Sequence, residues 1–391
     1  MPNPPSFTPG KRDKREFREA KIKIPPPGAK REPTETSPLS FLLPAGFTII
    51  GLIVMIVAAS ASDSGSTLLI SMAISVPMML GSYIVAYLNY RNGKRKYERD
   101  TQQREQRYQE TLAQSRKDLQ DLHEQTQTAL AHNAPSPEKC LTIVQQRDPT
   151  RMWARQPYHT DFLSLRLGIG DMPSHIAIEV PEYNTGTERD PLIDEARSIK
   201  DAFACIKEVP ISLPLAEAGV TGLCGERTEV LNAIRAVALQ IATHHSPLDV
   251  KIVAVYPVHE AQAWGWLRWL PHTWSNERDQ RYLACEKQTA HELLSDLQFC
   301  LEQRQLQSEQ GTPALRPRTH HPVYVFLLAD PQLIEGEPIL ELLLKQAHTL
   351  FAYSIVLADS KGSLPSGCKT VVELKSGKGV IEIETESPKQ R

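Results

Sequence analysis

Two long uncharged apolar runs near the N-terminus restrict what this 391-residue chain can fold into. The runs cover 41–61 and 68–88, and neither contains a charged residue. As a helix with a rise of about 1.5 Å per residue, each run would be roughly 30 Å long, which matches the hydrocarbon thickness of a bilayer. Only the short polar stretch 62–67 separates them. The sequence therefore predicts a two-helix transmembrane hairpin.

Basic residues flank this hairpin on both outer sides, whereas Asp63 is the single charge in the connector. Because loops rich in lysine and arginine stay in the cytoplasm, the sequence predicts a multi-pass cell-membrane protein with both termini cytoplasmic. A cleaved signal peptide is the alternative, since 58–61 are small residues. It fits less well, because the first run is too long for a signal core and lies behind forty mostly polar residues.

The segments on either side of the hairpin differ in character. Residues 1–40 mix basic residues with prolines and lack an apolar period, which is typical of a flexible basic cytoplasmic tail. Residues 89–133 contain no proline and are rich in Gln, Glu, Arg and Lys, which predicts a long helical stalk. A sparse apolar stripe in this stalk suits a weak coiled coil; its members are Tyr97, Tyr108, Leu112, Leu119, Leu122 and Leu130. Self-association into a homo-oligomer and packing on another partner remain open.

Residues 138–383 have the composition of a folded domain, and a polar tail at 384–391 follows. Apolar stretches of strand length alternate with helical patterns, which predicts an α/β domain with a mostly parallel sheet. The first strands are expected at 141–144, 162–167 and 175–180. The six cysteines form no CxxC pair, so we expect reduced, buried thiols.

One strand-to-helix junction has the context of a phosphate-binding loop. It contains Gly222, Gly225, Glu226, Arg227 and Thr228 and leads into a helix expected at 229–243. A functional loop needs a lysine that reaches the β and γ phosphates, and Glu226 stands in its place. The sequence predicts a degenerate, noncatalytic loop and no cofactor. Weak nucleotide binding stays open, because a helix N-terminus favours anions.

Other templates for chemistry are incomplete. The strand at 323–328 is followed by Asp330, which we interpret as a turn residue rather than a magnesium ligand. The histidine pairs 244–245 and 320–321 are interpreted as solvated loop residues, because adjacent histidines seldom share a metal.

Four of the five tryptophans lie within 264–274. Such density indicates a core or an interface. If the segment is helical, Trp266 and Trp269 share one face, so we expect these two to pack inward and Trp264 or Trp274 to lie nearer the surface. With Arg268 as its single cation, the segment gives no reason to expect nucleic-acid binding.

The order of these features resembles the N-terminal part of the type VII secretion membrane ATPases, the EccC/EssC-like branch of the FtsK/SpoIIIE superfamily. The resemblance rests on the tail, hairpin and stalk, and then on short motifs: Trp153-Ala154-Arg155-Gln156-Pro157, the segment 161–170 with Asp161, Phe162 and Arg166, Asp190-Pro191-Leu192, the segments 220–225 and 245–249, Trp264-Gly265-Trp266, and Trp269-Leu270-Pro271-His272. It implies a degenerate P-loop ATPase-like domain. It also implies structural or interface roles for Trp153, Arg155, Asp161, Phe162, Arg166, Trp266, Trp269, Pro271 and His272.

In that family, FtsK/SpoIIIE ATPase modules follow this region, and they are expected to be absent from this chain. The resemblance therefore implies a noncatalytic membrane component of a type VII-like protein secretion machine that couples to a separate FtsK/SpoIIIE-type ATPase and to other subunits. Half of a split ATPase, a regulatory paralogue and a truncated product are all compatible with it. A membrane-bound NTPase with a divergent loop and a membrane-tethered scaffold or sensor are the alternative functions.

Overall fold

The computed structural model describes residues 10–16, 20–29, 50, 53, 56–57, 65–182, 189–276, 279–309 and 322–383. The chain divides into two compact units. Unit 1 comprises Met1–Arg18, His123–Pro173 and Cys205–Arg391, and unit 2 comprises Glu19–Leu122 and Ser174–Ala204. Each unit is described by itself.

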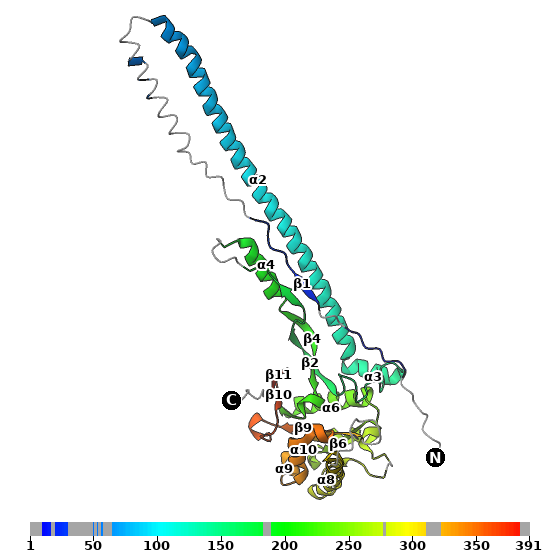
Figure 1. Ribbon diagram of the computed structural model, residues 1–391. Helices are drawn as coiled ribbons and strands as arrows, with labels where there is room; N and C mark the ends of the chain where they lie inside the picture. The colour runs from blue at the N-terminus through cyan, green and yellow to red at the C-terminus, as the bar shows by residue number, and fades with distance from the viewer. Residues whose placement is uncertain are drawn as a thin grey trace. The chain divides into compact units, whose positions relative to one another are not determined.

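Unit 2 is organised around α2 (Gly65–Asn133), a 69-residue helix that continues into unit 1. Figure 1 shows it as the long blue-to-cyan helix, with α4 (Pro191–Ala202) in green. A two-stranded parallel sheet joins β1 (Lys21–Lys23) to β3 (Ala177–Glu179). Asp190 caps α4 by accepting a hydrogen bond from the Leu192 amide. α2 ends at Asn133, where the sequence predicts the end of the stalk before Pro135.

The apolar stripe of the stalk packs within the chain. Tyr108, Leu112 and Leu119 are at most 5% exposed. The residues that cover them come from the N-terminal segment, β3 and α4; they are Ile24, Ile176, Ile178, Leu192, Ala196 and Ile199. The structure thus gives no support to the expected coiled coil, because these stripe residues already have apolar partners in unit 2.

The expectation of a free N-terminal tail is wrong for the described residues. In unit 1, the amides of Gly10 and Asp13 donate to the carbonyls of Pro149 and Thr150. In unit 2, β1 pairs with β3, and Ile24 is 1% exposed. The basic composition hid a short apolar stretch around Ile22 and Ile24, which is long enough to add one strand.

The first expected membrane span, 41–61, lies almost wholly outside the described residues. The second, 68–88, is helical and belongs to α2. Among the residues that the structure describes, no helix combines the length and the apolarity needed to cross a membrane.

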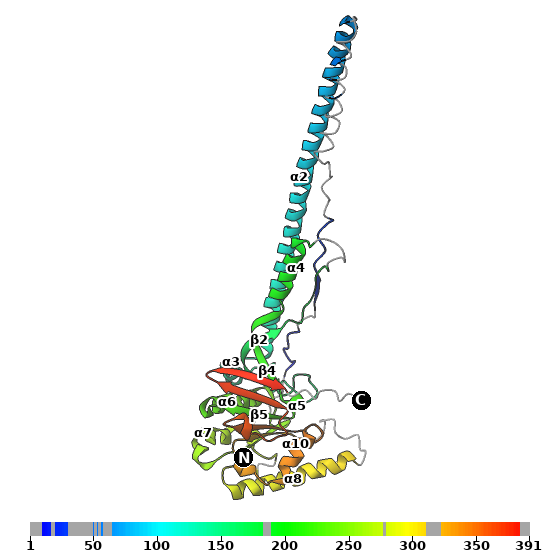
Figure 2. The ribbon, with the colours of Figure 1, turned by 90° about the vertical axis from the view of Figure 1, so that its left-hand side faces the viewer.

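Unit 1 is built on a seven-stranded sheet with the order β11-β10-β5-β9-β8-β6-β7. The strands are β5 (Val220–Gly225), β6 (Val250–Val255), β7 (Leu283–Ala284), β8 (Val323–Leu328), β9 (Ala352–Ala358), β10 (Thr370–Lys375) and β11 (Lys378–Ile383). Every neighbouring pair is parallel except β10 with β11, the hairpin drawn in red in Figure 2. The predicted α/β class with a mostly parallel sheet is confirmed.

Helices cover both faces of this sheet. α6 (Arg227–His244) packs on one face, and α8 (Lys287–Glu309) and α10 (Pro338–Leu350) pack on the other. Along β8, residues 323, 325 and 327 face α6, whereas 324, 326 and 328 face α8 and α10. The strand is buried on both sides, which explains its continuous apolar sequence.

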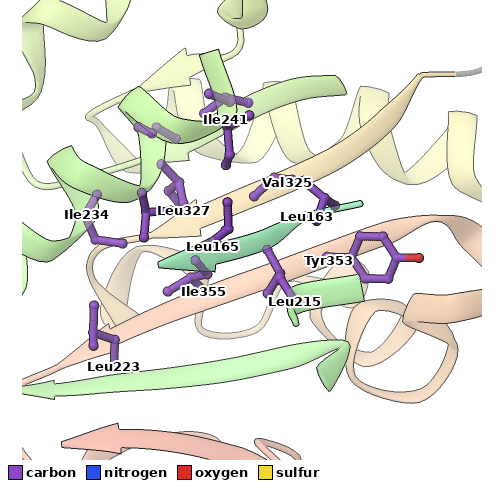
Figure 3. Close-up of a cluster of buried hydrophobic side chains, with 14 of the residues drawn as sticks. Leu163, Leu165, Leu215, Leu223, Ile234, Ile241, Val325, Leu327, Tyr353 and Ile355 are labelled. Carbon is purple, nitrogen blue, oxygen red and sulfur yellow. The ribbon is translucent and has the colours of Figure 1, made fainter. Parts of the chain in front are cut away.

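A separate antiparallel ribbon, β2 (Ser164–Pro173) with β4 (Cys205–Pro214), adjoins the α6 layer. Figure 3 shows Leu163 and Leu165, at the start of β2, among Ile234 and Ile241 of α6 and Val325 of β8. The N-terminal end of β2 is therefore packed into the main core.

The strand expected at 141–144 is wrong, because these residues lie in helix α3 (Pro137–Gln146). Ser136 accepts a hydrogen bond from the Lys139 amide, and Pro137 occupies the first turn. Both features favour a helix start. Cys140 and Ile143, three residues apart, are buried, whereas Leu141 is half exposed. The apolar run is one side of an amphipathic helix.

The tryptophan segment contradicts the expected burial. It consists of short helical pieces: η1 (Val258–Glu260), α7 (Ala261–Trp264), η2 (Gly265–Trp269) and η3 (Pro271–Thr273). Trp264 is 2% exposed and stacks on Tyr256 at 5.5 Å between ring centroids, whereas Trp269 is 77% exposed. Trp266 is partly buried against the core. The i, i+3 pair that faces inward is Trp264 with Leu267, so the periodicity was correct but its phase was wrong.

This arrangement predicts opposite outcomes for two tryptophan truncations. Trp264→Ala should lower the free energy of unfolding by about 3–5 kcal/mol, because it leaves a cavity in the core. Trp269→Ala should change it by less than about 0.5 kcal/mol. Thermal melts of both variants, followed by circular dichroism, test this. A larger loss for Trp269→Ala would contradict the burial described here.

Candidate functional site

The junction that was expected to be a degenerate phosphate-binding loop has almost no loop. β5 ends at Gly225, Glu226 is the N-cap, and α6 begins at Arg227. Gly222 lies inside β5, opposite Val371 of β10 and Val356 of β9. A phosphate loop works by directing free backbone amides at the ligand. Here the backbone of 220–225 belongs to the sheet ladder on both sides.

Gly225 is required at this turn. Its φ is 142°, and a Cβ atom there would lie 2.1 Å from the carbonyl oxygen of Leu374 in β10. Only glycine tolerates both conditions. The glycine in the motif therefore permits close strand packing rather than close approach of a ligand.

Arg227 occupies the adjoining edge of the sheet. Its Nε donates to Oε1 of Glu260 at 2.6 Å and its Nη2 to Oε2 at 2.8 Å, a bidentate pair. The same Nη2 donates to the carbonyl of Ala329, directly after β8, at 2.8 Å. Arg227 thereby connects the start of α6 to η1 and to the end of β8.

Carboxylates surround the start of α6. Glu260 also accepts from Trp264 Nε1 at 3.0 Å, Glu226 accepts from the Thr228 hydroxyl at 2.9 Å, and Glu229 accepts from the Gly377 amide at 2.7 Å. Burial alone would raise the pKa of Glu260, but the hydrogen bonds from Arg227 and Trp264 outweigh burial and lower it. A site lined by three carboxylate side chains is unfavourable for a triphosphate.

Asp330 behaves as a turn residue. Its side chain accepts from the Gln332 amide at 2.9 Å and caps α9 (Pro331–Ile334). The sequence-based interpretation of Asp330 is confirmed.

A second cluster lies where α2 ends, within unit 1. Three arginine side chains donate to three successive carbonyls there: Arg151 to His132, Arg155 to Asn133 at 2.6 Å, and Arg166 to Ala134 at 2.9 Å. We call Arg151, Arg155 and Arg166 the arginine cap. The last carbonyls of a helix lack intrahelical partners and carry the negative end of the helix dipole. Cationic donors therefore stabilise them both by hydrogen bonding and by charge–dipole attraction.

Arg155 is the most buried member of the arginine cap, at 6% exposure. It also donates to the Ser164 carbonyl at 2.7 Å and lies 3.5 Å from Asp161 Oδ2, which pairs with Arg12 as well. Burial lowers the pKa of Arg155 to about 10, so it stays charged at neutral pH. Burial would raise the pKa of Asp161, but the hydrogen bond from Arg12 and the charge of Arg155 lower it overall.

The same segment is attached to the C-terminal end of α6. Trp153 Nε1 donates to the Ala242 carbonyl at 3.0 Å, and the Arg155 amide donates to the His244 carbonyl at 2.9 Å. Gln240 accepts from the Arg166 amide at 2.7 Å and returns a bond to the Arg166 carbonyl at 2.8 Å. The end of α2 is therefore fixed to the main α/β core through Trp153, Arg155 and Arg166.

The histidines near this segment are buried, so the interpretation of 244–245 as solvated is wrong. His244 and His245 are at most 4% exposed. His245 Nε2 accepts from the Leu163 amide at 3.2 Å, and its ring meets Phe162 edge-on at 5.1 Å. His272, one residue after Pro271 in η3, donates from Nε2 to the His245 carbonyl at 2.8 Å. The pair 320–321 lies outside the described residues.

The described part of the chain holds no group of three or more His, Cys, Asp or Glu side chains that could bind a metal ion. All six cysteines are free thiols, but the expected burial holds only for Cys140, Cys224 and Cys368, because Cys205 is exposed and Cys285 and Cys300 are half-buried. Burial raises the pKa of Cys140 to about 11, which makes it a poor nucleophile.

Sequence reasoning missed Glu260, Arg151 and Gln240. Glu260 belongs to none of the sequence motifs named above, and its partner Arg227 lies 33 positions away. No local spacing signals such a pair. Arg151 lies two residues before the Trp153 motif, and its function becomes evident only once the end of α2 is placed beside it.

Comparison with known proteins confirms the expected resemblance. No family model matches the chain. It is 29% identical over 313 residues to the ESX secretion system protein EccC of Geobacillus thermodenitrificans, covering 80% of this chain and 21% of that protein. It is 29% identical over 325 residues to YukB of Bacillus subtilis, covering 83% and 21%, and 24% identical over 307 residues to EssC of Staphylococcus aureus, covering 78% and 21%. The chain thus spans about a fifth of the length of these EccC/EssC-type relatives.

Two solved structures of EssC are similar to part of the chain. EssC (ATPases 2 and 3) from Geobacillus thermodenitrificans is 15% identical, with a TM-score of 0.38, over 57% of this chain and 39% of that one. The cytoplasmic domain of EssC is 11% identical, with a TM-score of 0.31, over 53% and 51%.

The arginine cap predicts a strong effect of removing Arg155. Arg155→Met should lower the free energy of unfolding by about 3–5 kcal/mol, because it breaks a buried ion pair and leaves the Asn133 and Ser164 carbonyls without donors. Hydrogen exchange of the last turn of α2 should rise in parallel. Arg235→Met, at an exposed position on α6, is the matched control and should change neither quantity. Equal effects of the two variants would refute the cap.

Buried neutral histidines predict a loss of stability in acid. Burial lowers the pKa of His272 to about 4, and it lowers the pKa of His244 and His245 well below the ordinary value. The unfolded chain therefore binds protons below about pH 6.5 that the folded chain refuses, and stability falls as pH drops from about 6.5 towards 4. Urea unfolding at several pH values measures this slope.

His272→Gln keeps a donor for the His245 carbonyl but does not titrate, so its stability should depend less on pH than that of the wild type. His259→Gln, an exposed control, should leave the slope unchanged. Identical slopes for the wild type and His272→Gln would contradict this account of His272.

Proposed function

We propose that the chain is a nonhydrolysing, membrane-associated component of a type VII-like protein secretion machine that couples to a separate FtsK/SpoIIIE-type ATPase. Similarity to EccC, YukB and EssC supports the secretion role. One observation carries the noncatalytic part: Arg227 and Glu260 form a bidentate pair across the sheet edge where a nucleotide would bind.

Three features of that edge argue against hydrolysis. The amides of 220–225 belong to the sheet, Glu226 replaces the lysine, and Asp330 caps a turn instead of holding magnesium-bound water. Phosphoryl transfer depends almost entirely on positioned cations and amides around the phosphates. Arg227, the nearest cation, is bound to Glu260 and Ala329.

The coupling part of the proposal relies on the arginine cap. A helix transmits displacement to a domain only if its end is held firmly, and Arg151, Arg155 and Arg166 hold the end of α2 through three carbonyls. Membrane attachment is proposed from the uncharged runs 41–61 and 68–88, as a hairpin with both termini cytoplasmic. Secretion subunits and a second copy of the chain are proposed partners, and no nucleic acid is expected.

The chain should therefore show no ATP turnover above background in the presence of Mg²⁺. Glu226→Lys should not restore turnover, because the sheet ladder still holds the backbone amides. Steady phosphate release, measured on the purified full chain, is the readout. Arg227→Ala serves as the matched variant that removes the side chain occupying the edge.

Hydrolysis by the wild type that disappears in Thr228→Ala would favour a membrane-bound NTPase with a divergent loop. Absence of turnover, together with recovery of an FtsK/SpoIIIE-type ATPase after cross-linking in membranes, supports the proposal. Absence of turnover without that ATPase would leave the tethered scaffold or sensor as the better account.

A further inference from the structure

We infer that α2 carries a binding surface for anionic phospholipid headgroups at 84–99. The inference rests on the membrane association proposed above and specifies the lipid class. The surface has two adjoining parts: the exposed apolar side chains of Ile84, Val85, Tyr87 and Leu88, and a basic collar, defined as Arg91, Lys94, Arg95, Lys96 and Arg99.

The apolar part of the surface is exposed, unlike the apolar stripe farther along the same helix. Ile84, Val85 and Tyr87 are 59%, 57% and 61% exposed. Ile84 lies three residues before Tyr87 and four before Leu88, so these side chains share one broad side of α2 with Val85. Farther along the helix, Tyr108, Leu112 and Leu119 are covered by apolar residues of unit 2. The side chains at 84, 85, 87 and 88 are exposed instead.

The basic collar begins three residues after Leu88. Its five side chains are exposed, and Glu98 is the single carboxylate among them. In the part of the chain that the structure describes, none of the ion pairs involves a collar residue. Folding thus leaves these charges available for an external anion.

The adjacency of the two parts selects the partner. A bilayer with anionic lipid offers hydrocarbon and, directly outside it, a layer of negative headgroups, which is the order of apolar and basic residues along α2. Each lysine or arginine near such a surface increases affinity about fivefold. Nucleic acid would match the collar but leave Ile84, Val85 and Leu88 exposed to water.

Flotation of the full chain with lipid vesicles tests the inference. The vesicles consist of phosphatidylcholine alone, or of phosphatidylcholine with about a third replaced by phosphatidylglycerol. The wild type should prefer the anionic vesicles, and the preference should weaken as salt rises. In the triple variant Lys94→Gln, Arg95→Gln, Lys96→Gln, the preference should fall on the order of a hundredfold.

The matched control removes the same number of charges from exposed positions of α2 outside the collar: Arg107→Gln, Arg116→Gln, Lys117→Gln. It should keep the wild-type preference. The double variant Val85→Gln, Leu88→Gln should weaken binding to both vesicles while keeping their ratio. Circular dichroism melts confirm that each variant is folded.

Equal losses in the two triple variants would overturn the inference, because net charge would then explain the binding. Equal binding of the wild type to both vesicles would overturn the lipid class while leaving membrane association in place. Absence of any vesicle binding, with collar-dependent binding of duplex DNA instead, would overturn it in favour of nucleic acid. None of these outcomes depends on ATP turnover or on capture of an ATPase.

Discussion

The arginine cap is the contact that holds the last residues of α2, 123–133, within unit 1. A helix as long as α2 ends in carbonyls that no residue of its own can satisfy. Arg155 donates to one of these carbonyls from a buried position. Its buried charge needs a counter-charge, which Asp161 supplies, and Asp161 also pairs with Arg12. These requirements constrain the path of the segment 151–166, because it contacts the ends of both α2 and α6. Removing the central guanidinium would leave the carbonyls of Asn133 and Ser164 without this donor.

At the edge of the sheet, polar groups are also paired within the protein, and this pairing makes them unavailable to a ligand. At a nucleotide site, cations and amides remain free until the ligand arrives. Here Arg227 is bound to Glu260 and to the end of β8, and the glycine backbone is paired with β9 and β10. The groups that would bind phosphate instead hold three elements of the domain together. Ligand binding would have to break those contacts first.

The sequence was most informative where a feature depends on neighbours along the chain. The parallel sheet, the end of α2 before Pro135 and the turn at Asp330 all follow from local pattern. The sequence was misleading where tertiary contacts determine the secondary structure or the buried face of a segment. The apolar run 141–144 has no period long enough to separate strand from helix, and the cap at Ser136 settles it as α3. The phase of the tryptophan face depends on which side of η2 meets the core.

Pairs distant in sequence lay beyond such reasoning altogether. Arg227 with Glu260, and Arg166 with Gln240, are joined only by folding, and the residues between them carry no signal of the contact.

The basic side chains at and along α2 differ in whether they already have hydrogen-bond partners. Each cation of the arginine cap donates to a carbonyl at the end of α2, whereas within the described residues the basic collar makes no such bond. Affinity for an anionic surface must therefore come from the collar, at the part of α2 where apolar side chains are also exposed.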